Sequence, residues 1–147
     1  MLIKKINIKD TPFSSGLVRD YIESEKLNSF FSHKNQLDNY KNIIKKISSF
    51  PLKKRDLLYN VLNSQYNGIS DISSVLDSIE KLKNKNTFTV TTGHQLCLNT
   101  GPLYFIYKIL HTIKLCVELS KTYKEFNFIP VFLMASEYHD FEEIKSF

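Results

Sequence analysis

Residues 87–115 read TFTVTTGHQLCLNTGPLYFIYKILHTIKL, and this stretch decides the fold. Its first part, residues 87–91, alternates β-branched and aromatic side chains, which predicts a strand. The alternation breaks at residues 92–95, which predicts a loop. From about residue 101 to 121 the chain is apolar except for a narrow polar stripe, and this pattern predicts a long helix buried on most sides. The stretch therefore predicts a strand, a polar loop and a helix in that order.

The start of the helix and the next apolar run complete the unit. Thr100 or Gly101 is expected to cap the helix, with Pro102 in its first turn. The run FIPVFLMA, residues 128–135, suits an inner parallel strand. Because Pro130 has no N–H to donate, the paired part of this strand is expected to begin at or after it. A strand, a long helix and a second strand form a parallel βαβ unit, so the fold class is α/β.

The first 86 residues are predicted to be a helical lead-in to the βαβ unit of residues 87–147. No internal repeat and no long linker is visible, so the whole of 1–147 is expected to belong to one domain. Four helical patterns occupy the lead-in, with Pro51 ending the second and Asn67-Gly68 ending the third. They cover residues 12–31, 37–47, 57–66 and 70–82.

The net charge of +5 raises the question of a nucleic-acid partner. Residues 1–86 carry 15 basic and 9 acidic groups, whereas residues 87–147 carry 5 and 6. Basic residues alternate with Asn and Ser on helical faces, and Lys53-Lys54-Arg55 is the densest run. This pattern indicates a solvated helical surface and argues against nucleic acid as a partner.

Cysteine usage and hydropathy bear on the compartment. Cys97 and Cys116 are too far apart for a Cys-x-x-Cys motif, so a reducing cytoplasm is expected. The N-terminus MLIKKINIKD lacks the apolar core of a signal peptide. The most hydrophobic segment, residues 103–119, is too short and too charged to span a bilayer. No membrane partner is expected.

The parallel arrangement predicts where chemistry takes place. Both strands point the same way, so the loops that follow them meet at one edge of the sheet, where open α/β folds bind ligands. The first loop carries His94 and Gln95 as candidates for catalysis. The second loop, residues 136–144, carries Glu137, His139 and Asp140. One histidine with several carboxylates suits a general acid and base, or a metal, although the spacing matches no zincin motif and no metal ligand is assigned.

The glycines of the first loop form neither a Walker nor a dinucleotide pattern. What remains is the amino end of the helix at Gly101, which suits an anion, or a plain connection between strand and helix. Lys108 lies two turns into the helix and is expected to be structural. Both cysteines are expected to be small buried side chains. Cys97 could be a nucleophile only with a base beside it, for which His94 is the candidate.

At these residues the sequence resembles the bacillithiol biosynthesis cysteine-adding enzymes, the BshC family. That family shows T-G-Q-Q-x-G-L-x-T-G-P-L-Y-x-x-x-K and then P-V-F-W-x-A-x-E-D-H-D-x-x-E-I. This chain departs from the two motifs at His94 for Gln, Cys97 for Gly, Leu133 for Trp and Tyr138 for Asp. Positions that match the first motif are Thr92, Gly93, Gln95, Thr100, Gly101, Pro102, Leu103, Tyr104 and Lys108. Positions that match the second are Pro130, Val131, Phe132, Ala135, Glu137, His139, Asp140, Glu143 and Ile144.

The resemblance implies a cytoplasmic, Rossmann-like ligase that forms an amide bond between cysteine and glucosaminyl-malate. Activation of the carboxyl group by ATP or another nucleotide is suspected for the family, and the cofactor is left unassigned here. The resemblance also implies a homodimer built through a coiled-coil arm in full-length members. The residues expected to hold the amine or the acid are His94, Gln95, Glu137, His139 and Asp140. Those expected to bind substrate or an anion are Thr92, Gly93, Thr100, Gly101 and Tyr104.

Family chains are several times longer, so residues 1–147 are expected to be an N-terminal portion that lacks the remaining strands and the arm. A two-stranded sheet is marginal alone, so this portion is expected to aggregate or bind weakly rather than to catalyse. Two other classes stay open. One is another nucleotide-using α/β enzyme of the nucleotidyl-transferase type, against which the missing His-x-Gly-His signature counts. The other is a non-catalytic helical interaction module.

Overall fold

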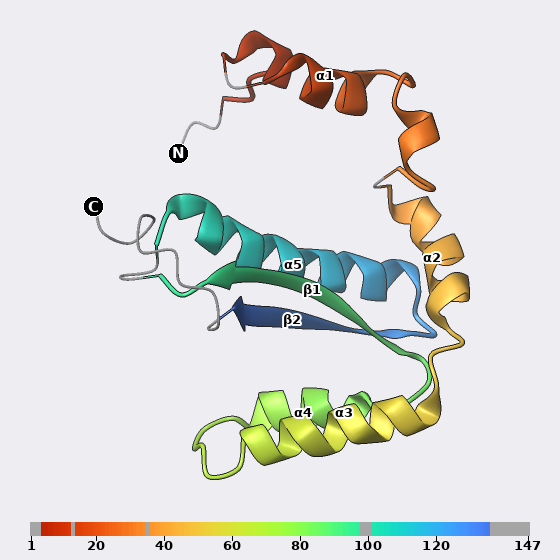
Figure 1. The fold of residues 1–147 in the computed structure, drawn as a ribbon, viewed down its shortest axis with the longest axis vertical. Helices are drawn as coiled ribbons and strands as arrows, with labels where there is room; N and C mark the ends of the chain where they lie inside the picture. Colours follow the sequence, from red (N-terminus) through yellow and green to blue (C-terminus); the bar gives the residue numbers. More distant parts are fainter. Residues whose placement is uncertain (1–3, 13, 35, 98–100, 136–147) are drawn as a thin grey trace. The chain divides into compact units, whose positions relative to one another are not determined.

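The computed structural model describes residues 4–12, 14–34, 36–97 and 101–135. The chain divides into two compact units, Met1–Lys41 and Asn42–Phe147, which are drawn together in Figure 1 and described separately below. In the described residues, no helix combines the length and the apolar character needed to cross a membrane.

Among its described residues, the first unit contains the α-helix α1 (Gly16–Glu23). Short 3₁₀ turns precede and follow it, at Ile8–Asp10, Asn28–Phe30 and Leu37–Asn39. The prediction of a single helix over residues 12–31 is therefore wrong. Local capping explains the difference, since serine side chains are effective caps that compete with helix continuation.

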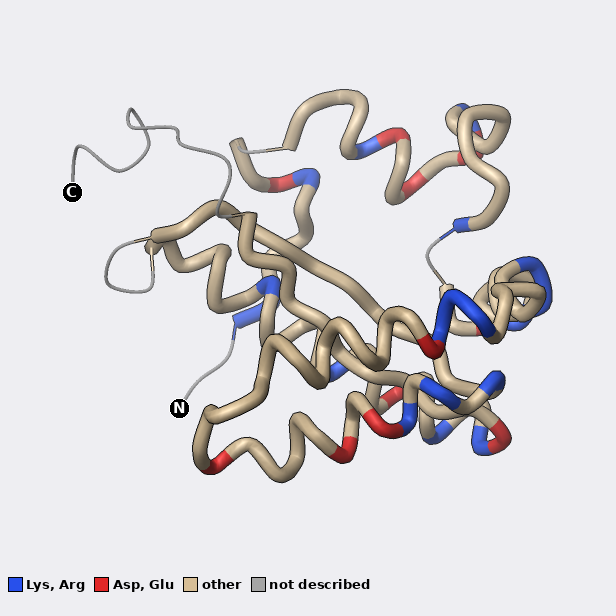
Figure 2. The backbone as a smooth tube through the Cα atoms, turned by 60° about the horizontal axis from the view of Figure 1, so that its bottom comes forward, with Lys and Arg blue, Asp and Glu red and all other residues tan. Residues whose placement is uncertain are grey.

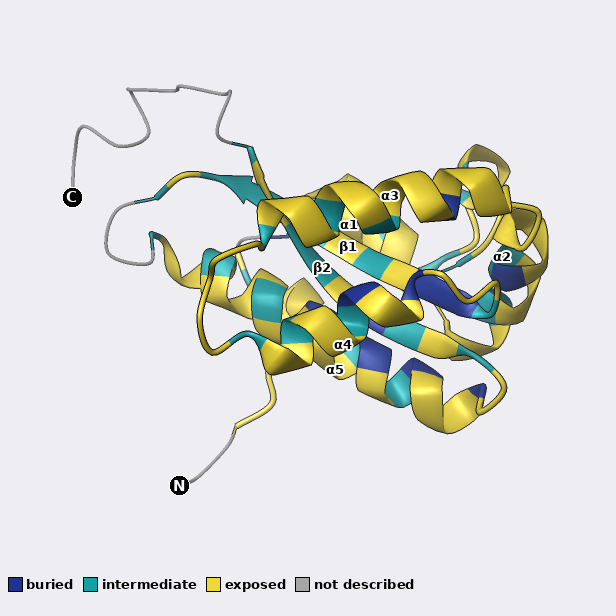
Figure 3. Ribbon diagram, turned by 90° about the horizontal axis from the view of Figure 1, so that it is seen from below, coloured by how far each residue is buried: buried dark blue, intermediate teal, exposed yellow. Residues whose placement is uncertain are grey.

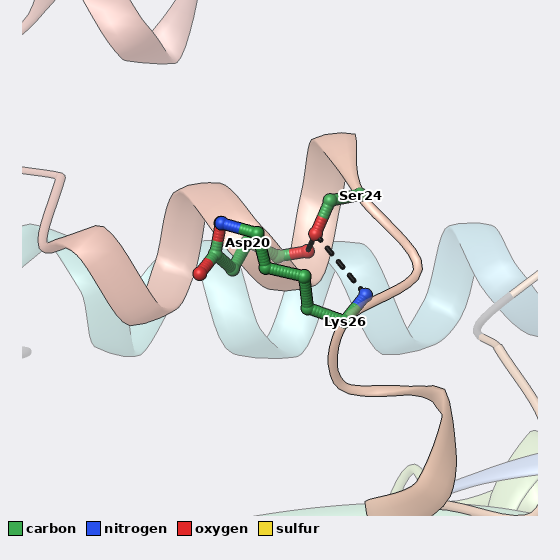
Figure 4. A network of polar contacts seen from close by, with 3 residues as sticks. All are labelled: Asp20, Ser24 and Lys26. Atoms are coloured by element: carbon green, nitrogen blue, oxygen red, sulfur yellow. Dashed lines mark hydrogen bonds and ion pairs between the residues drawn. The ribbon is translucent and has the colours of Figure 1, made fainter.

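Two serines bound α1. The Ser15 hydroxyl accepts a hydrogen bond from the Val18 N–H at 3.3 Å and so caps the first turn. At the other end, the Ser24 hydroxyl donates to the Asp20 carbonyl at 2.8 Å and accepts from the Lys26 N–H at 3.3 Å. The Lys26 ammonium also lies 3.0 Å from the Asp20 carboxylate (Figure 4). These local bonds end the helix at Glu23, eight residues before Phe31, where the predicted segment ends.

Three further helices precede the sheet, and all three were predicted, although their bounds differ. Helix α2 (Tyr40–Ile47) passes from the first unit into the second. Helix α3 (Leu52–Gln65) starts directly after Pro51, which is its N-cap. Helix α4 (Ser73–Lys81) starts three residues later than residue 70. Among these three, α3 and α4 pack against each other.

In the part of the chain that the structure describes, the sheet consists of two parallel strands, β1 (Thr87–Gln95) and β2 (Asn127–Ala135). Their register pairs Thr87 with Asn127 and Gln95 with Ala135, so both strands end at the same level. Helix α5 (Leu103–Thr122) connects them and packs on one face of the sheet, while α3 and α4 lie on the other face (Figure 1). The predicted parallel βαβ unit is confirmed.

Strand pairing extends further than expected at both ends. Residues 92–95, predicted to be a loop, continue β1, and β2 pairs from Asn127 rather than from Pro130. The Asn127 N–H donates to the Asn86 carbonyl at 2.9 Å. Because alternate residues of a parallel strand bond to opposite sides, this bond places the Pro130 nitrogen on the side away from β1. The missing N–H therefore removes no bond of this ladder.

The core lies at the amino ends of the strands. Thr87 and Leu119 are each 1% exposed, and Phe88 and Ile129 are also buried. The ring of Phe88 contacts that of Phe126 at a centroid distance of 5.4 Å. Figure 3 shows buried residues gathered at this end of the sheet, on the side of α4. Along the rest of the strands the residues are mostly intermediate or exposed. Among the described residues, the carboxyl ends of the strands are thus the less buried part of the unit.

Charged side chains are absent from both strands. In the second unit the basic residues before the sheet lie on α2, α3 and α4 and the turn after α4, and acidic residues are interspersed on α3 and α4 (Figure 2). Arg55, from the densest basic run, is 6% exposed and thus part of the core rather than of a solvated surface.

Candidate active site

The end of β1 and the first turns of α5 bring His94 and Tyr104 together. His94 Nε2 lies 2.7 Å from the Tyr104 hydroxyl oxygen, and the ring of Phe105 packs edge-on against the imidazole at 5.4 Å. Phe105 in turn contacts Phe132 of β2 at 5.2 Å. The imidazole is therefore held by aromatic packing on one side and by a hydroxyl at its tip.

Nδ1 of His94 lies between two groups, 3.0 Å from the Gln95 carbonyl oxygen and 3.2 Å from Cys97 Sγ. When Nδ1 carries the ring proton it donates to the carbonyl, and when Nε2 carries it Nδ1 is free to accept a proton from the thiol. The Tyr104 hydroxyl can donate or accept, so Nε2 is satisfied with or without a proton of its own. The ring is thus positioned to exchange a proton through Nε2 with the Tyr104 oxygen.

Lys108, which was expected to be structural, lies beside the same cluster. Its ammonium donates to the Gly93 carbonyl at 3.2 Å and lies 5.4 Å from the centre of the Tyr104 ring. The signal for this role is its spacing, because residues four apart on a helix share a face. An exposed cation beside the first turn of α5 adds to the positive end of the helix dipole.

Two glycines allow close approach around the cluster. A Cβ on Gly93 would lie 2.8 Å from the Leu133 carbonyl oxygen of β2, so the strand pair needs glycine at this position. Gly101 has φ +60°, and a Cβ there would lie 2.7 Å from Cys97 Cβ and 2.8 Å from Cys97 Sγ. Gly101 precedes the helix cap, which is Pro102 rather than Thr100 or Gly101 as expected.

The two cysteines differ in environment. Cys116 is 4% exposed, and burial raises the pKa of its thiol to about 11, which confirms the prediction for this residue. Cys97 is half-buried, and its Sγ lies 3.2 Å from His94 Nδ1 and 3.4 Å from the Gln95 carbonyl. For Cys97 the base named as a requirement is present.

The other predicted residues lie elsewhere. His94 faces α5, and side chains alternate along a strand, so the Gln95 side chain projects from the opposite face of β1. In the predicted loop, the side chains of His94 and Gln95 would not have been placed on opposite faces by strand alternation. Thr92 lies on the same face as His94, opposite Phe132 in the register. Four predicted residues lie outside the described part of the chain, namely Thr100, Glu137, His139 and Asp140.

The arrangement supports acid–base chemistry and anion binding at one edge. A histidine bonded to an exposed tyrosine hydroxyl can move a proton to or from a bound group. Lys108 and the positive end of the α5 dipole can hold a carboxylate or phosphate. Within residues 4–135, as far as they are described, no three His, Cys, Asp or Glu side chains form a metal-binding group.

Comparison with known proteins relates this chain to one family. The model of the N-terminal Rossmann-like domain of bacillithiol biosynthesis BshC matches residues 1–147. The "Putative cysteine ligase BshC" of Flavobacterium johnsoniae is 44% identical over 144 residues, which cover 97% of this chain and 27% of that protein. The proteins of the same name from Christiangramia forsetii and Cytophaga hutchinsonii are 42% and 39% identical.

These two matches cover 97% and 99% of this chain, and 27% and 28% of the respective relatives. The chain thus spans about a quarter of the length of these curated relatives. The family match extends over the whole chain, and the observed parallel βαβ unit agrees with the Rossmann-like description. This chain therefore belongs to the bacillithiol biosynthesis BshC family, of which it represents the N-terminal Rossmann-like domain.

Proposed function

We propose that the protein containing this chain is a ligase of bacillithiol biosynthesis that joins the carboxyl group of cysteine to the amine of glucosaminyl-malate. The observation that carries the proposal is the match of 97% to 99% of the chain to relatives named "Putative cysteine ligase BshC", at 39% to 44% identity. Because the chain spans 27% of the length of the first of these relatives, the activity is proposed for the longer protein.

The site at the end of β1 supports this proposal by its chemistry. Amide formation needs a base that takes a proton from the attacking amine, and a group that stabilises negative charge on the carboxyl oxygens. His94 and Tyr104, 2.7 Å apart, suit the first task. Lys108, which faces the same edge through its bond to the Gly93 carbonyl, suits the second.

The second half of the proposed site follows β2. Gln95 and Ala135 are paired in the register, so β1 and β2 end at the same edge of the sheet. We include Glu137, His139 and Asp140 in the proposal on this basis, as groups that bind the amine or exchange its proton. ATP or another nucleotide is the proposed means of activating the carboxyl group.

The test is an assay of the full protein with cysteine and glucosaminyl-malate, with and without ATP, followed by mass spectrometry of the product. We expect a product heavier than glucosaminyl-malate by one cysteinyl group. His139→Ala and Glu137→Ala are each expected to lower turnover at least about a hundredfold if they act as acid or base. Absence of the amide product under all conditions would refute the proposed function. Unchanged turnover in both variants would show that His139 and Glu137 take no part in the reaction.

A further inference from the structure

We propose that Cys97 is a nucleophilic thiol, with His94 as its base, that undergoes thiol–disulfide exchange with disulfides of small thiols. The proposal assigns a modification site and is independent of the ligase reaction proposed above. Three observations support it, namely the Cys97–His94 contact, the fixed orientation of the imidazole and the contrast with Cys116.

The contact has the geometry of an activated nucleophile. Cys97 Sγ lies 3.2 Å from His94 Nδ1, within reach for proton transfer, and the Cys97 side chain is half-buried rather than enclosed. The Tyr104 hydroxyl, 2.7 Å from Nε2, orients the ring from its other end. A nucleophile, a base and a third group that orients the base are the elements of activated cysteine and serine sites.

The contacts around His94 also accommodate the transferred proton. Loss of the thiol proton to Nδ1 produces an N–H that lies 3.0 Å from the Gln95 carbonyl oxygen and 3.2 Å from the sulfur. The Nε2–H of the charged ring then donates to the Tyr104 oxygen. Each N–H of the imidazolium therefore has an acceptor, and the thiolate keeps a donor.

The exchange itself needs only a small disulfide as co-reactant. The Cys97 thiolate attacks one sulfur of R–S–S–R, a new S–S bond forms between Cys97 and that sulfur, and the old S–S bond breaks. The second R–S group leaves as a thiolate and carries the electron pair. Cys97 is oxidised to a mixed disulfide and half of the small disulfide is reduced. The added group then sits beside Gly101, where α5 begins, because a Cβ at Gly101 would lie 2.8 Å from Sγ.

Cys116 provides a control within the same molecule. It is 4% exposed, and burial raises the pKa of its thiol to about 11. A small disulfide reacts slowly with such a thiol because access and the thiolate form are both suppressed. Labelling of Cys116 therefore reports loss of the fold.

The experiment treats the purified full protein with excess cystine at pH 7, stops the reaction with acid at timed intervals, and quantifies the peptides carrying Cys97 and Cys116 by mass spectrometry. The reference is a synthetic peptide of residues 92–101, which holds the same cysteine and histidine without the folded geometry. Because an ordinary thiol is only a few per cent thiolate at pH 7, we expect Cys97 to react about tenfold faster in the protein than in the peptide.

A His94→Gln variant tests the base, since glutamine keeps hydrogen bonding but takes no proton. We expect Cys97 in this variant to react about tenfold more slowly than in the wild type, with Cys116 still protected. A protein rate no faster than the peptide rate would overturn the proposal, as would an unchanged rate in a His94→Gln variant whose Cys116 stays protected. If Cys116 becomes labelled, the variant has unfolded and the peptide comparison decides alone.

Discussion

The hydroxyl of Tyr104 connects the two halves of the described site. It lies 2.7 Å from His94 on β1, and the Lys108 ammonium lies 5.4 Å from the centre of its ring. His94 lies on β1 and Lys108 lies one helical turn after Tyr104, yet the three side chains meet beside the first two turns of α5. Tyr104 is 51% exposed, so its oxygen is open to a bound group.

Gly101 is the residue whose conformation sets the entry to α5. Its φ of +60° is unfavourable for other residues, and an added Cβ would meet Cys97 at 2.7 Å. We expect Gly101→Ala to destabilise the start of α5 by about 2 kcal/mol, of which about 1–2 kcal/mol comes from the left-handed backbone. Hydrogen–deuterium exchange of peptides from the first turns of α5 in the full protein measures this as about 30-fold faster exchange.

The matched control for this change is Gly16→Ala in α1, where an added Cβ meets nothing within 4 Å. Exchange of α1 peptides in this control is expected to stay the same or slow down, because alanine favours helix. Equal exchange of the α5 peptides in wild type and Gly101→Ala would refute the claim that this position requires glycine.

The strands show what local sequence can and cannot predict. The alternation of residues 87–91 and the apolar run of 128–135 were sufficient to predict two strands and the helix between them. Local pattern missed the extension of β1 through Gly93, because the bonds that keep glycine in a strand come from β2, some 40 residues away. The same non-local pairing placed His94 and Gln95 on opposite faces.

Buried Arg55 anchors α3 to the turn before β1. Its guanidinium donates to the carbonyls of Leu82 and Thr87 at 3.2 and 3.0 Å, and to that of Lys85 at 3.4 Å. Arg55→Met would leave these carbonyls without a donor, so we expect a loss of about 3 kcal/mol. Hydrogen–deuterium exchange of the β1 peptide measures the loss. Lys54→Met, one residue earlier and exposed, is the control and is expected to change stability by less than about 0.5 kcal/mol.

An Arg55→Met variant with β1 exchange as slow as the control would show that these three bonds contribute nothing net. Sequence alone could not identify this role, because Arg55 lies within a basic run typical of a surface, and its carbonyl partners are 27 to 32 residues away. Burial of an arginine depends on acceptors that tertiary folding brings together.

Burial of the Cys116 thiol makes the stability of the protein depend on pH. Its pKa is raised from 9.0 to about 11 by burial, so the unfolded chain loses the thiol proton first. The stability that the buried, protonated thiol contributes is fully present below pH 9, falls as the pH rises through 9, and is lost by pH 11. We expect the unfolding free energy of the wild type, relative to Cys116→Ala, to fall by about 1 kcal/mol between pH 7.5 and pH 10.

The measurement is denaturant unfolding of both proteins at a series of pH values, taken as a difference so that other titrating groups cancel. A constant offset from pH 7.5 to pH 10 would be at odds with a buried, protonated thiol at position 116.

At the scale of the whole molecule, α5 presents an apolar outer surface. Leu110, Ile113 and Val117 are 55%, 45% and 48% exposed, and among the described residues each strand pairs on one side only. The relatives have about three quarters of their length beyond the part that matches. We therefore keep the prediction that residues 1–147 alone aggregate or bind weakly, and that catalysis requires the longer protein.

At this scale the edge that holds the candidate site was predictable, as were His94 and Tyr104, whereas the place of Lys108 beside them was not. Parallel strands bring the ends of β1 and β2 to one edge, which the sequence order alone implies. Inclusion of Cys97 and Lys108 depended on side-chain reach across the start of α5, with contacts of 3.2 Å in each case. Periodicity places a residue on a face but does not define which atom a long or polarisable side chain touches.

We expect the proposed ligase reaction of the protein containing this chain to take place at this edge of the sheet. The most direct measurement compares the amide-forming activity of the full protein with that of Tyr104→Phe and Tyr107→Phe, at saturating cysteine and glucosaminyl-malate. Both tyrosines are exposed on α5, but the Tyr104 hydroxyl bonds to His94. We expect Tyr104→Phe to lower kcat at least about tenfold and Tyr107→Phe to leave kcat within about twofold of the wild-type value. Equal activity of the two variants would contradict this expectation.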